Sequence, residues 1–375
     1  MTSLGNTRTA PDDDGKILII GGYGHVGRLI AGRLAPLFPD RIIIAGRNIE
    51  KAKTVATVIG HGVEGRAIDI FTASSNGASD GAVPENVTLV LVCIDQNTTR
   101  FAEQCLNRGI CYIDISADYG FLSQLEKLDQ LAKQKSACVV LSVGVAPGLT
   151  NLLAARVKQK MDSVERIEIL LEFGLGDDHG QAAVEWMFDN LDATFEIRKN
   201  GQVNTVQSFD ESINIGLSSK HPARPAYCFN FSDQHVIGRT LGVPDVSTWV
   251  RFEDRFSTWL FAKASQAGLG KLLRRRRWRK IAVWLFLNVH MGSDSCGVAV
   301  RAMGRAGNNT QTQVQTIGII GRKEALMTAI VAAETVRQVL SGKLPPGVHH
   351  SEQVIKLDPV VSALKDEMPD IAITL

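Results

Sequence analysis

Residues 16–31, KILIIGGYGHVGRLIA, decide the fold of this chain. The first five are almost entirely apolar, which is typical of a parallel strand buried on both faces. Gly22, Gly24 and Gly27 then fit the pattern G-x-G-x-x-G, and apolar residues recur at helical spacing as far as Leu37. A strand, a glycine turn and a helix in this order predict a dinucleotide-binding turn.

The same alternation continues to residue 143. Short apolar runs predict strands at 16–20, 41–45, 67–70, 87–94, 110–115 and 137–143. Helical spacing between them predicts helices at 25–37, 49–59, 98–107 and 122–135. Repeated units of this kind form a doubly wound parallel sheet with right-handed crossovers. We therefore predict an α/β fold with a Rossmann domain over residues 16–148, after a flexible tail at 1–15.

The pattern changes after Gly148 and indicates a second domain. The sequence predicts helices at 149–161 and 181–197 and from 256 beyond 279, a strand at 166–173, and antiparallel strands at 297–303 and 312–320. These elements predict an α+β domain over residues 149–321. An amphipathic helix at 323–340 follows, and we expect the C-terminal segment 322–375 to return to the first domain.

The composition excludes several classes of protein. Lys and Arg total 41 and Asp and Glu total 39, so the net charge of +2 gives no global case for nucleic-acid binding. The six cysteines form no C-x-x-C pair and no metal-ligand spacing appears, so we predict no metal and a reducing compartment, the cytoplasm. The polar start lacks a secretory signal, and the apolar run at 281–289 is too short to span a membrane.

Each glycine of the turn has a physical reason. Gly22 permits the tight turn, Gly24 lets the backbone approach a pyrophosphate, and Gly27 lets the helix pack close to the strand. The phosphates then lie at the helix N-terminus, where free N–H groups and the helix dipole favour negative charge.

The second predicted strand is followed by a cation. Arg47 lies 20 positions after Gly27, where an NAD-selective site carries Asp or Glu to bind the ribose 2′-OH. A guanidinium matches a 2′-phosphate instead. We therefore predict NADP as the cofactor, with NAD as the less favoured alternative. The predicted cofactor-binding residues are Gly22, Tyr23, Gly24, His25, Val26, Gly27, Arg47, Asn48, Asp69 and Asp95.

Four segments together resemble the saccharopine dehydrogenase-like family of NADP-binding oxidoreductases. They are KILIIGGYGHVGRLIAGRL from Lys16, YIDISADYG from Tyr112, VGVAPGLTNLLA from Val143, and SGKLPPGVHHSEQV from Ser341. The resemblance implies a Rossmann domain, a nicotinamide cofactor and a second α+β domain that often dimerises, so we predict a homodimer. Well-known members of this family reduce the imine formed from an amine and a carbonyl, whereas other members act on different substrates or have none assigned. The chain departs from a saccharopine reductase at Ala146-Pro147-Gly148, where that enzyme has Asp-Pro-Gly, which argues against the specific saccharopine activity.

Polar residues that directly follow predicted strands are the candidates for catalysis. Ligands of an open α/β sheet bind beyond the carboxyl ends of its strands. His179 and Tyr119 are the candidate proton donors, and Asp118 and Asp178 could orient or hold an amine. Alternatively, an Asp in this position caps the next helix. We expect the reacting centre between the loops 114–119 and 177–179.

Three further residues are candidates for substrate binding. Asp114 follows the fifth predicted strand, and Asn151 opens the helix after Pro147-Gly148. Arg239, or alternatively Arg224, could bind an acidic substrate, although a surface salt bridge is the simpler role for either.

A basic and aromatic stretch lies in the second domain. Lys271-Leu-Leu-Arg-Arg-Arg-Arg-Trp-Arg-Lys280 is followed by an apolar run, and Phe256 and Trp259 precede it. The simplest interpretation is two amphipathic helices packed on their own domain with a solvated basic face. Peripheral membrane contact through 256–289, or a lipid-like substrate, is the first alternative. Nucleic acid is the least favoured.

The sequence thus predicts an NADP-dependent oxidoreductase that reduces a C=N or a related polarised double bond of a small or medium metabolite. One alternative is a reductase of a lipid-like or carrier-bound substrate at a membrane surface. Another is an NADP-binding sensor that performs no chemistry.

Overall fold

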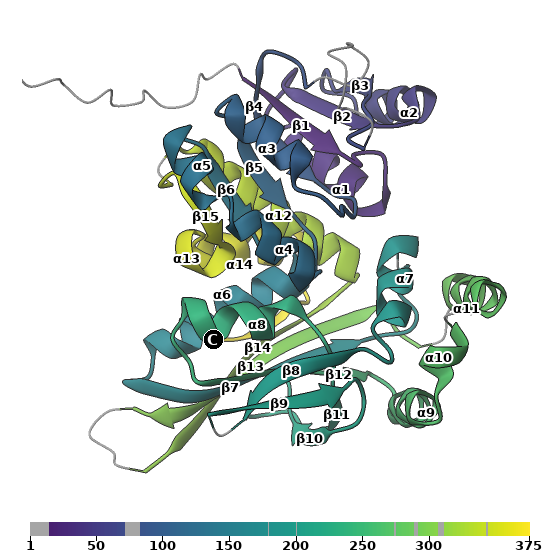
Figure 1. Ribbon diagram of the computed structural model, residues 1–375, viewed down its shortest axis with the longest axis vertical. Helices are drawn as coiled ribbons and strands as arrows, with labels where there is room; N and C mark the ends of the chain where they lie inside the picture. Colours follow the sequence, from purple (N-terminus) through teal and green to yellow (C-terminus); the bar gives the residue numbers. More distant parts are fainter. Residues whose placement is uncertain are drawn as a thin grey trace, which may run out of the picture. The chain divides into compact units, whose positions relative to one another are not determined.

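The computed structural model describes residues 15–71, 83–178, 180–199, 201–273, 275–288, 292–306, 311–342 and 344–375. The chain forms two compact units, which Figure 1 shows coloured along the sequence. The first unit contains residues up to Ser116, Gly120–Leu141 and Ala332–His349. The second contains Ala117–Tyr119, Ser142–Val331 and His350–Leu375.

The first unit is built on a seven-stranded sheet in the order β15-β6-β5-β4-β1-β2-β3. Its strands are β1 (Lys16–Ile20), β2 (Ile42–Gly46), β3 (Glu64–Ala67), β4 (Val87–Val92), β5 (Cys111–Asp114), β6 (Cys138–Leu141) and β15 (Gly347–His350). All pairs from β3 to β6 in this order are parallel. The strand order reverses between β1 and β4, which is the point where an open α/β sheet takes its ligand.

Five helices connect these strands, and a sixth begins in the second unit and ends in the first. They are α1 (His25–Leu34), α2 (Ile49–Ile59), α3 (Arg100–Asn107), α4 (Tyr119–Glu126), α5 (Asp129–Gln134) and α12 (Glu324–Leu340). Strands β1, β2 and β4 form the centre of the core, because their residues are almost all apolar and buried. This confirms the predicted α/β fold with a doubly wound parallel sheet.

The second unit has a seven-stranded mixed sheet in the order β10-β11-β12-β7-β13-β14-β16. Its strands are β7 (Ser163–Phe173), β10 (Ser212–Ile215), β11 (Arg224–Cys228), β12 (Asp245–Phe252), β13 (Ser295–Arg305), β14 (Gln313–Arg322) and β16 (Ala372–Thr374). Among the described strands of this sheet, β7 and β12 pair in parallel and the other pairs are antiparallel. A separate hairpin consists of β8 (Thr194–Lys199) and β9 (Gln202–Gln207).

The described helices of the second unit lie in five regions of the chain. They are α6 (Thr150–Gln159) after a kinked turn η1 (Val145–Leu149), α7 (Gln181–Asp189), α8 (Ser232–Thr240), then α9 (Arg255–Gln266), α10 (Leu269–Leu273) and α11 (Arg276–Asn288), and finally α13 (Ser351–Val354) and α14 (Leu357–Glu367). Within the described residues, no helix is long and apolar enough to cross a membrane.

Several predicted elements differ from the structure. The helix predicted at 181–197 ends at Asp189, and its second half is strand β8, where buried Phe195 and Ile197 alternate with exposed residues. The single helix predicted from 256 is three helices, because Gly268 adopts a φ of 88° between the first two. The strand predicted at 67–70 is β3, three residues earlier.

The C-terminal segment 322–375 divides between the two units. Residues 332–349 lie in the first unit, where β15 adds an edge strand next to β6. Residues 350–375 lie in the second unit, where β16 pairs antiparallel with β14. The placement of the whole segment on the first domain therefore needs correction, because the backbone of 372–374 completes the other sheet.

Candidate cofactor and substrate sites

Backbone contacts close the glycine turn between β1 and α1. The N–H of Gly21 donates to Ala45 O of β2 at 2.8 Å, and Gly21 has a φ of 76°, which favours glycine. A Cβ on Gly27 would lie 2.3 Å from Gly21 O, and a Cβ on Gly22 would lie 2.7 Å from a side-chain carbon of Ile44. Both positions are therefore closed to larger residues. A Cβ on Gly24 would meet one atom only, Gly21 O at 3.0 Å, and Gly24 is exposed.

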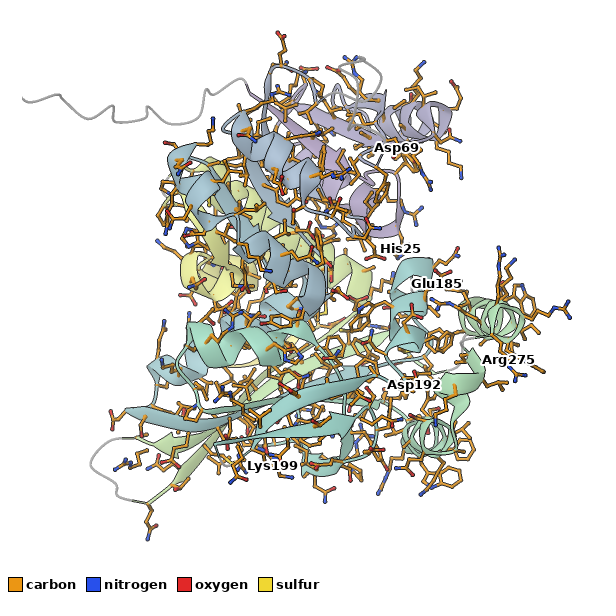
Figure 2. All side chains as sticks on the ribbon, in the orientation of Figure 1. His25, Asp69, Glu185, Asp192, Lys199 and Arg275 are labelled. Carbon is orange, nitrogen blue, oxygen red and sulfur yellow. The ribbon has the colours of Figure 1, made fainter. Side chains whose placement is uncertain are left out.

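The N-terminus of α1 is open to an anion. Its N-cap, Gly24, supplies no capping side chain, and its first turn contains no acidic residue. Free N–H groups and the helix dipole favour a phosphate at such a helix end. His25 and Val26, both half-buried, form the start of this helix, and Figure 2 labels His25 there. The residues present thus fit the pyrophosphate of a dinucleotide.

Tyr23 joins the glycine turn to the end of β2. Its phenol lies against Gly46, where a Cβ would be 2.6 Å from Tyr23 Oη, and it accepts the N–H of Asn48 at 3.2 Å. Asn48 in turn caps α2 by accepting the N–H of Lys51 at 3.0 Å. Arg47 is exposed and has no ion-pair or hydrogen-bond partner within the part of the chain that the structure describes. Its charge is therefore available to a ligand phosphate beside the turn.

Two carboxylates follow other strands of this sheet. Asp69 comes after β3, is half-buried, and accepts the N–H of Phe71 at 3.0 Å; Figure 2 labels it in the first unit. Asp95 comes after β4 and is exposed. Because the carboxyl ends of parallel strands share one edge, both residues lie on the edge that carries the glycine turn.

Asp114 at the end of β5 is fully buried in a hydrogen-bonded network. Its Oδ2 accepts from Tyr112 Oη and Gln96 Nε2, both at 2.9 Å, and its Oδ1 accepts the N–H of Ser116 at 2.8 Å. Burial, aided by the nearby charge of Asp95, outweighs these hydrogen bonds and raises the pKa of Asp114 to about 7. With an exposed fraction of 0%, Asp114 supports the loop rather than a substrate.

Tyr119 belongs to a compact group in the second unit. Its ring stacks on His235 of α8 with centroids 4.7 Å apart and planes 23° apart. The guanidinium carbon of Arg239, one turn further along α8, lies 6.0 Å from the centre of the Tyr119 ring. His235 Nε2 and Asn230 Oδ1 lie 2.8 Å apart. Burial, followed by the charge of Arg239, lowers the pKa of His235 to about 4, so its imidazole is neutral at pH 7.

The other candidate cation of this unit is already paired. Arg224 forms an ion pair with the buried carboxylate of Glu172, which also pairs with Arg251 at 2.5 Å. Arg239 is exposed and is the more accessible of the two cations. Arg224 is therefore held by a buried carboxylate, whereas the side chain of Arg239 reaches the surface of the unit.

Asn151 is a buried residue that links neighbouring segments of the chain. It is 0% exposed, its Oδ1 accepts the N–H of Gly148 at 3.0 Å, and its Nδ2 donates to Glu352 Oε2 at 2.9 Å. The other oxygen of Glu352 accepts from the hydroxyl of Thr240. Both ends of the Asn151 amide are therefore used to hold η1 and α13 to α6, and a substrate cannot reach it.

The loop after β7 contains a helix cap. Buried Asp177 accepts the N–H of Asp178 at 2.8 Å and the N–H of Glu324, at the start of α12, at 2.7 Å. Asp178 and Asp118 are exposed. His179, the first candidate proton donor, lies outside the described residues.

The sequence did not identify His235 as a member of the group around Tyr119. His235 and Arg239 are four residues apart on one helix and so share a face, a spacing that could have identified them together. Nothing in the sequence indicates that Tyr119, more than a hundred positions away, stacks on His235.

The fold and the glycine turn define the class of the first unit as a dinucleotide-binding domain. Residues 17–140 match the model of the family described as the saccharopine dehydrogenase NADP binding domain, which confirms the predicted resemblance for this part of the chain.

The chain shares its fold with one solved structure, and a second solved structure matches at a lower TM-score. A saccharopine dehydrogenase (L-Glu forming) from Saccharomyces cerevisiae is 12% identical, with a TM-score of 0.62, and the match covers 96% of this chain and 100% of that one. The DAP dehydrogenase of C. glutamicum is 11% identical, with a TM-score of 0.43, over 93% of this chain and 99% of that one. A comparison with curated proteins returned no match.

Proposed function

We propose that this chain is an NADP-dependent oxidoreductase of the saccharopine dehydrogenase-like type that reduces a C=N, or a related polarised double bond, of a small or medium metabolite. The observation that carries the proposal is the combination of an open glycine turn with the unpartnered Arg47 beside it, inside a domain of the NADP-binding family. The uncapped start of α1 binds the pyrophosphate, and Arg47 binds the 2′-phosphate.

When bound, a nicotinamide would supply a hydride to the carbon of the substrate double bond. The protein must then position the substrate and provide a proton to nitrogen. We assign the proton to the phenol of Tyr119, whose ring is held by His235, and the binding of an anionic substrate group to Arg239. Because His235 is neutral, it adds no charge to that of Arg239, and a guanidinium suits a carboxylate or phosphate on the substrate. Asp118, Asp178 and His179 remain candidate partners for an amine or a proton.

The test is consumption of NADPH with a panel of amine and carbonyl pairs, some with an anionic group and some without. Turnover that requires both partners supports imine reduction, and preference for anionic members supports the role of Arg239. Arg239→Gln should raise KM for the anionic members by about tenfold or more, because a charged hydrogen bond contributes about 1.5–3 kcal/mol. Lys220→Gln, an exposed cation elsewhere in the same unit, is the matched control.

Tight NADPH binding without turnover of any pair would favour the alternative of a sensor. We also propose a homodimer, which light scattering of the purified protein tests directly. The six free cysteines suit a reducing compartment such as the cytoplasm.

A further inference from the structure

Helix α9 exposes large apolar side chains, which are unfavourable on a surface that faces only water. Phe256, Trp259 and Leu260 are 65%, 52% and 46% exposed, and they share one helical face. The opposite face buries hydroxyl groups: Thr258 Oγ1 donates to Phe252 O, and Ser265 Oγ donates to Leu191 O at 2.8 Å. Because these buried hydroxyls are bonded, the orientation of α9 is fixed by its own contacts.

Helix α11 repeats the pattern. Trp278, Ile281, Trp284 and Leu285 are 46–59% exposed, whereas Val283 is buried. Eight of the thirteen large apolar side chains that are exposed in the described residues fall between 256 and 285. Single exposed apolar residues are ordinary, but a contiguous group marks an interaction surface.

The inner face of α11 is firmly attached to its own unit. Arg279 forms an ion pair with both carboxylate oxygens of Asp189 at the end of α7. Phe286 packs edge-on against Phe188 and Phe261, with ring centres 5.9 and 6.4 Å away. The exposed apolar face is therefore the outer side of an anchored helix. Figure 1 shows α9, α10 and α11 together at one side of the second unit.

The same segment is strongly cationic. Residues 255–288 contain nine Lys and Arg and no Asp or Glu, although the whole chain has a net charge of only +2. Lys271, Arg275, Arg276, Arg277 and Lys280 are exposed and have no ion-pair partner in the part of the chain that the structure describes. Figure 2 labels Arg275 at this side of the unit.

We propose that α9, α10 and α11 form a membrane-docking surface that binds the headgroup region of an anionic phospholipid bilayer. Tryptophan, phenylalanine and leucine on the outer faces of helices rich in Lys and Arg are typical of interfacial helices. The cations bind lipid phosphates while the aromatic rings enter the boundary with the acyl chains. Because the positive charge is concentrated in this segment, electrostatic attraction orients the protein with this surface towards an anionic membrane.

The test uses the full chain and two kinds of lipid vesicle, phosphatidylcholine alone and phosphatidylcholine with phosphatidylglycerol. The protein should float with the anionic vesicles at low salt and much less with the neutral ones, and added salt should weaken binding. Brominated lipid should quench part of the tryptophan fluorescence, because Trp259, Trp278 and Trp284 are exposed while Trp249 is buried.

Two sets of variants separate the contributions. Arg275→Gln, Arg276→Gln and Lys280→Gln together should lower the partition coefficient by on the order of a hundredfold, since each charge near an anionic surface contributes about fivefold. Trp278→Gln with Trp284→Gln should abolish quenching at those sites. The matched control replaces exposed lysines elsewhere in the second unit, Lys160, Lys220 and Lys365, by glutamine and should bind as the wild type does.

Equal binding to neutral and anionic vesicles would overturn the proposal, and so would equal losses in the control. Dissociation of a dimer by the tryptophan variants without vesicle binding would assign the surface to a second copy of the chain. Binding of an oligonucleotide in place of vesicles would assign it to nucleic acid. Because no cofactor or substrate is present, these outcomes are independent of the proposed enzymatic activity.

Discussion

Replacement of Gly24 by valine should remove the cofactor without unfolding the protein. Gly24 has a φ of −74° and a ψ of 177°, which any residue adopts, and a Cβ there would meet only Gly21 O at 3.0 Å. The added methyl groups would therefore project into the open space before α1, where the phosphates must lie. Loss of two charge-assisted hydrogen bonds at about 1.5–3 kcal/mol each predicts at least a hundredfold weaker NADPH binding.

Two other glycines of the same helix provide the comparison. A Cβ on Gly27 would overlap backbone atoms at 2.3 and 2.8 Å, so Gly27→Ala should destabilise the first unit by about 1–3 kcal/mol. Gly32 is exposed within α1 and has nothing within 4 Å of its Cβ position, so Gly32→Ala should stabilise by about 1 kcal/mol and leave binding intact.

Calorimetric titration with NADPH and urea denaturation of all three variants provide the assay. The expected order is lost binding with normal stability for Gly24→Val, lost stability for Gly27→Ala, and a slight gain for Gly32→Ala. A folded Gly24→Val variant that binds NADPH as tightly as the wild type would refute the assignment of the phosphate site.

Two further predictions concern the buried carboxyl of Asp114 and the phenol of Tyr119. Burial raises the pKa of Asp114 to about 7 from the usual 3.8, so its protonated form stabilises the fold, and that contribution is lost as the pH rises from 4 towards 8. Urea midpoints at several pH values should fall more steeply for the wild type than for Asp114→Asn, with an upper bound of about 4 kcal/mol over the window; parallel profiles would disprove the buried titration. Tyr119→Phe should lower kcat by about 10²–10⁴ with unchanged NADPH affinity, and an unchanged kcat would exclude the phenol as proton donor.

Most of the first unit could be predicted from the sequence because short, contiguous sequence patterns determine its strands and its glycine turn. Strands buried on both faces need continuous apolar runs, such as 16–20 and 41–45, and the glycine pattern marks the turn between strand and helix. Edge strand β15 could not be predicted, because the sequence Gly-Val-His-His carries no apolar run and its pairing depends on β6, some 200 positions earlier.

The candidate site was predicted less completely. The sequence identifies polar residues after strands, but it does not show which become buried. Asn151 and Asp114 are both fully buried and bonded to neighbours, whereas Tyr119 packs beside Arg239 and remains half exposed. These outcomes depend on contacts across long separations, such as that between Asn151 and Glu352, and no local pattern encodes them.

The selectivity conferred by Arg47 tests the central claim most directly. Titration of the wild type and of Arg47→Ala with NADPH and with NADH measures the four affinities. The exposed, unpartnered guanidinium predicts that the substitution weakens NADPH by about ten- to a hundredfold, equivalent to 1.5–3 kcal/mol, and leaves NADH nearly unchanged. Equal losses for both cofactors, or no loss for NADPH, would contradict the account.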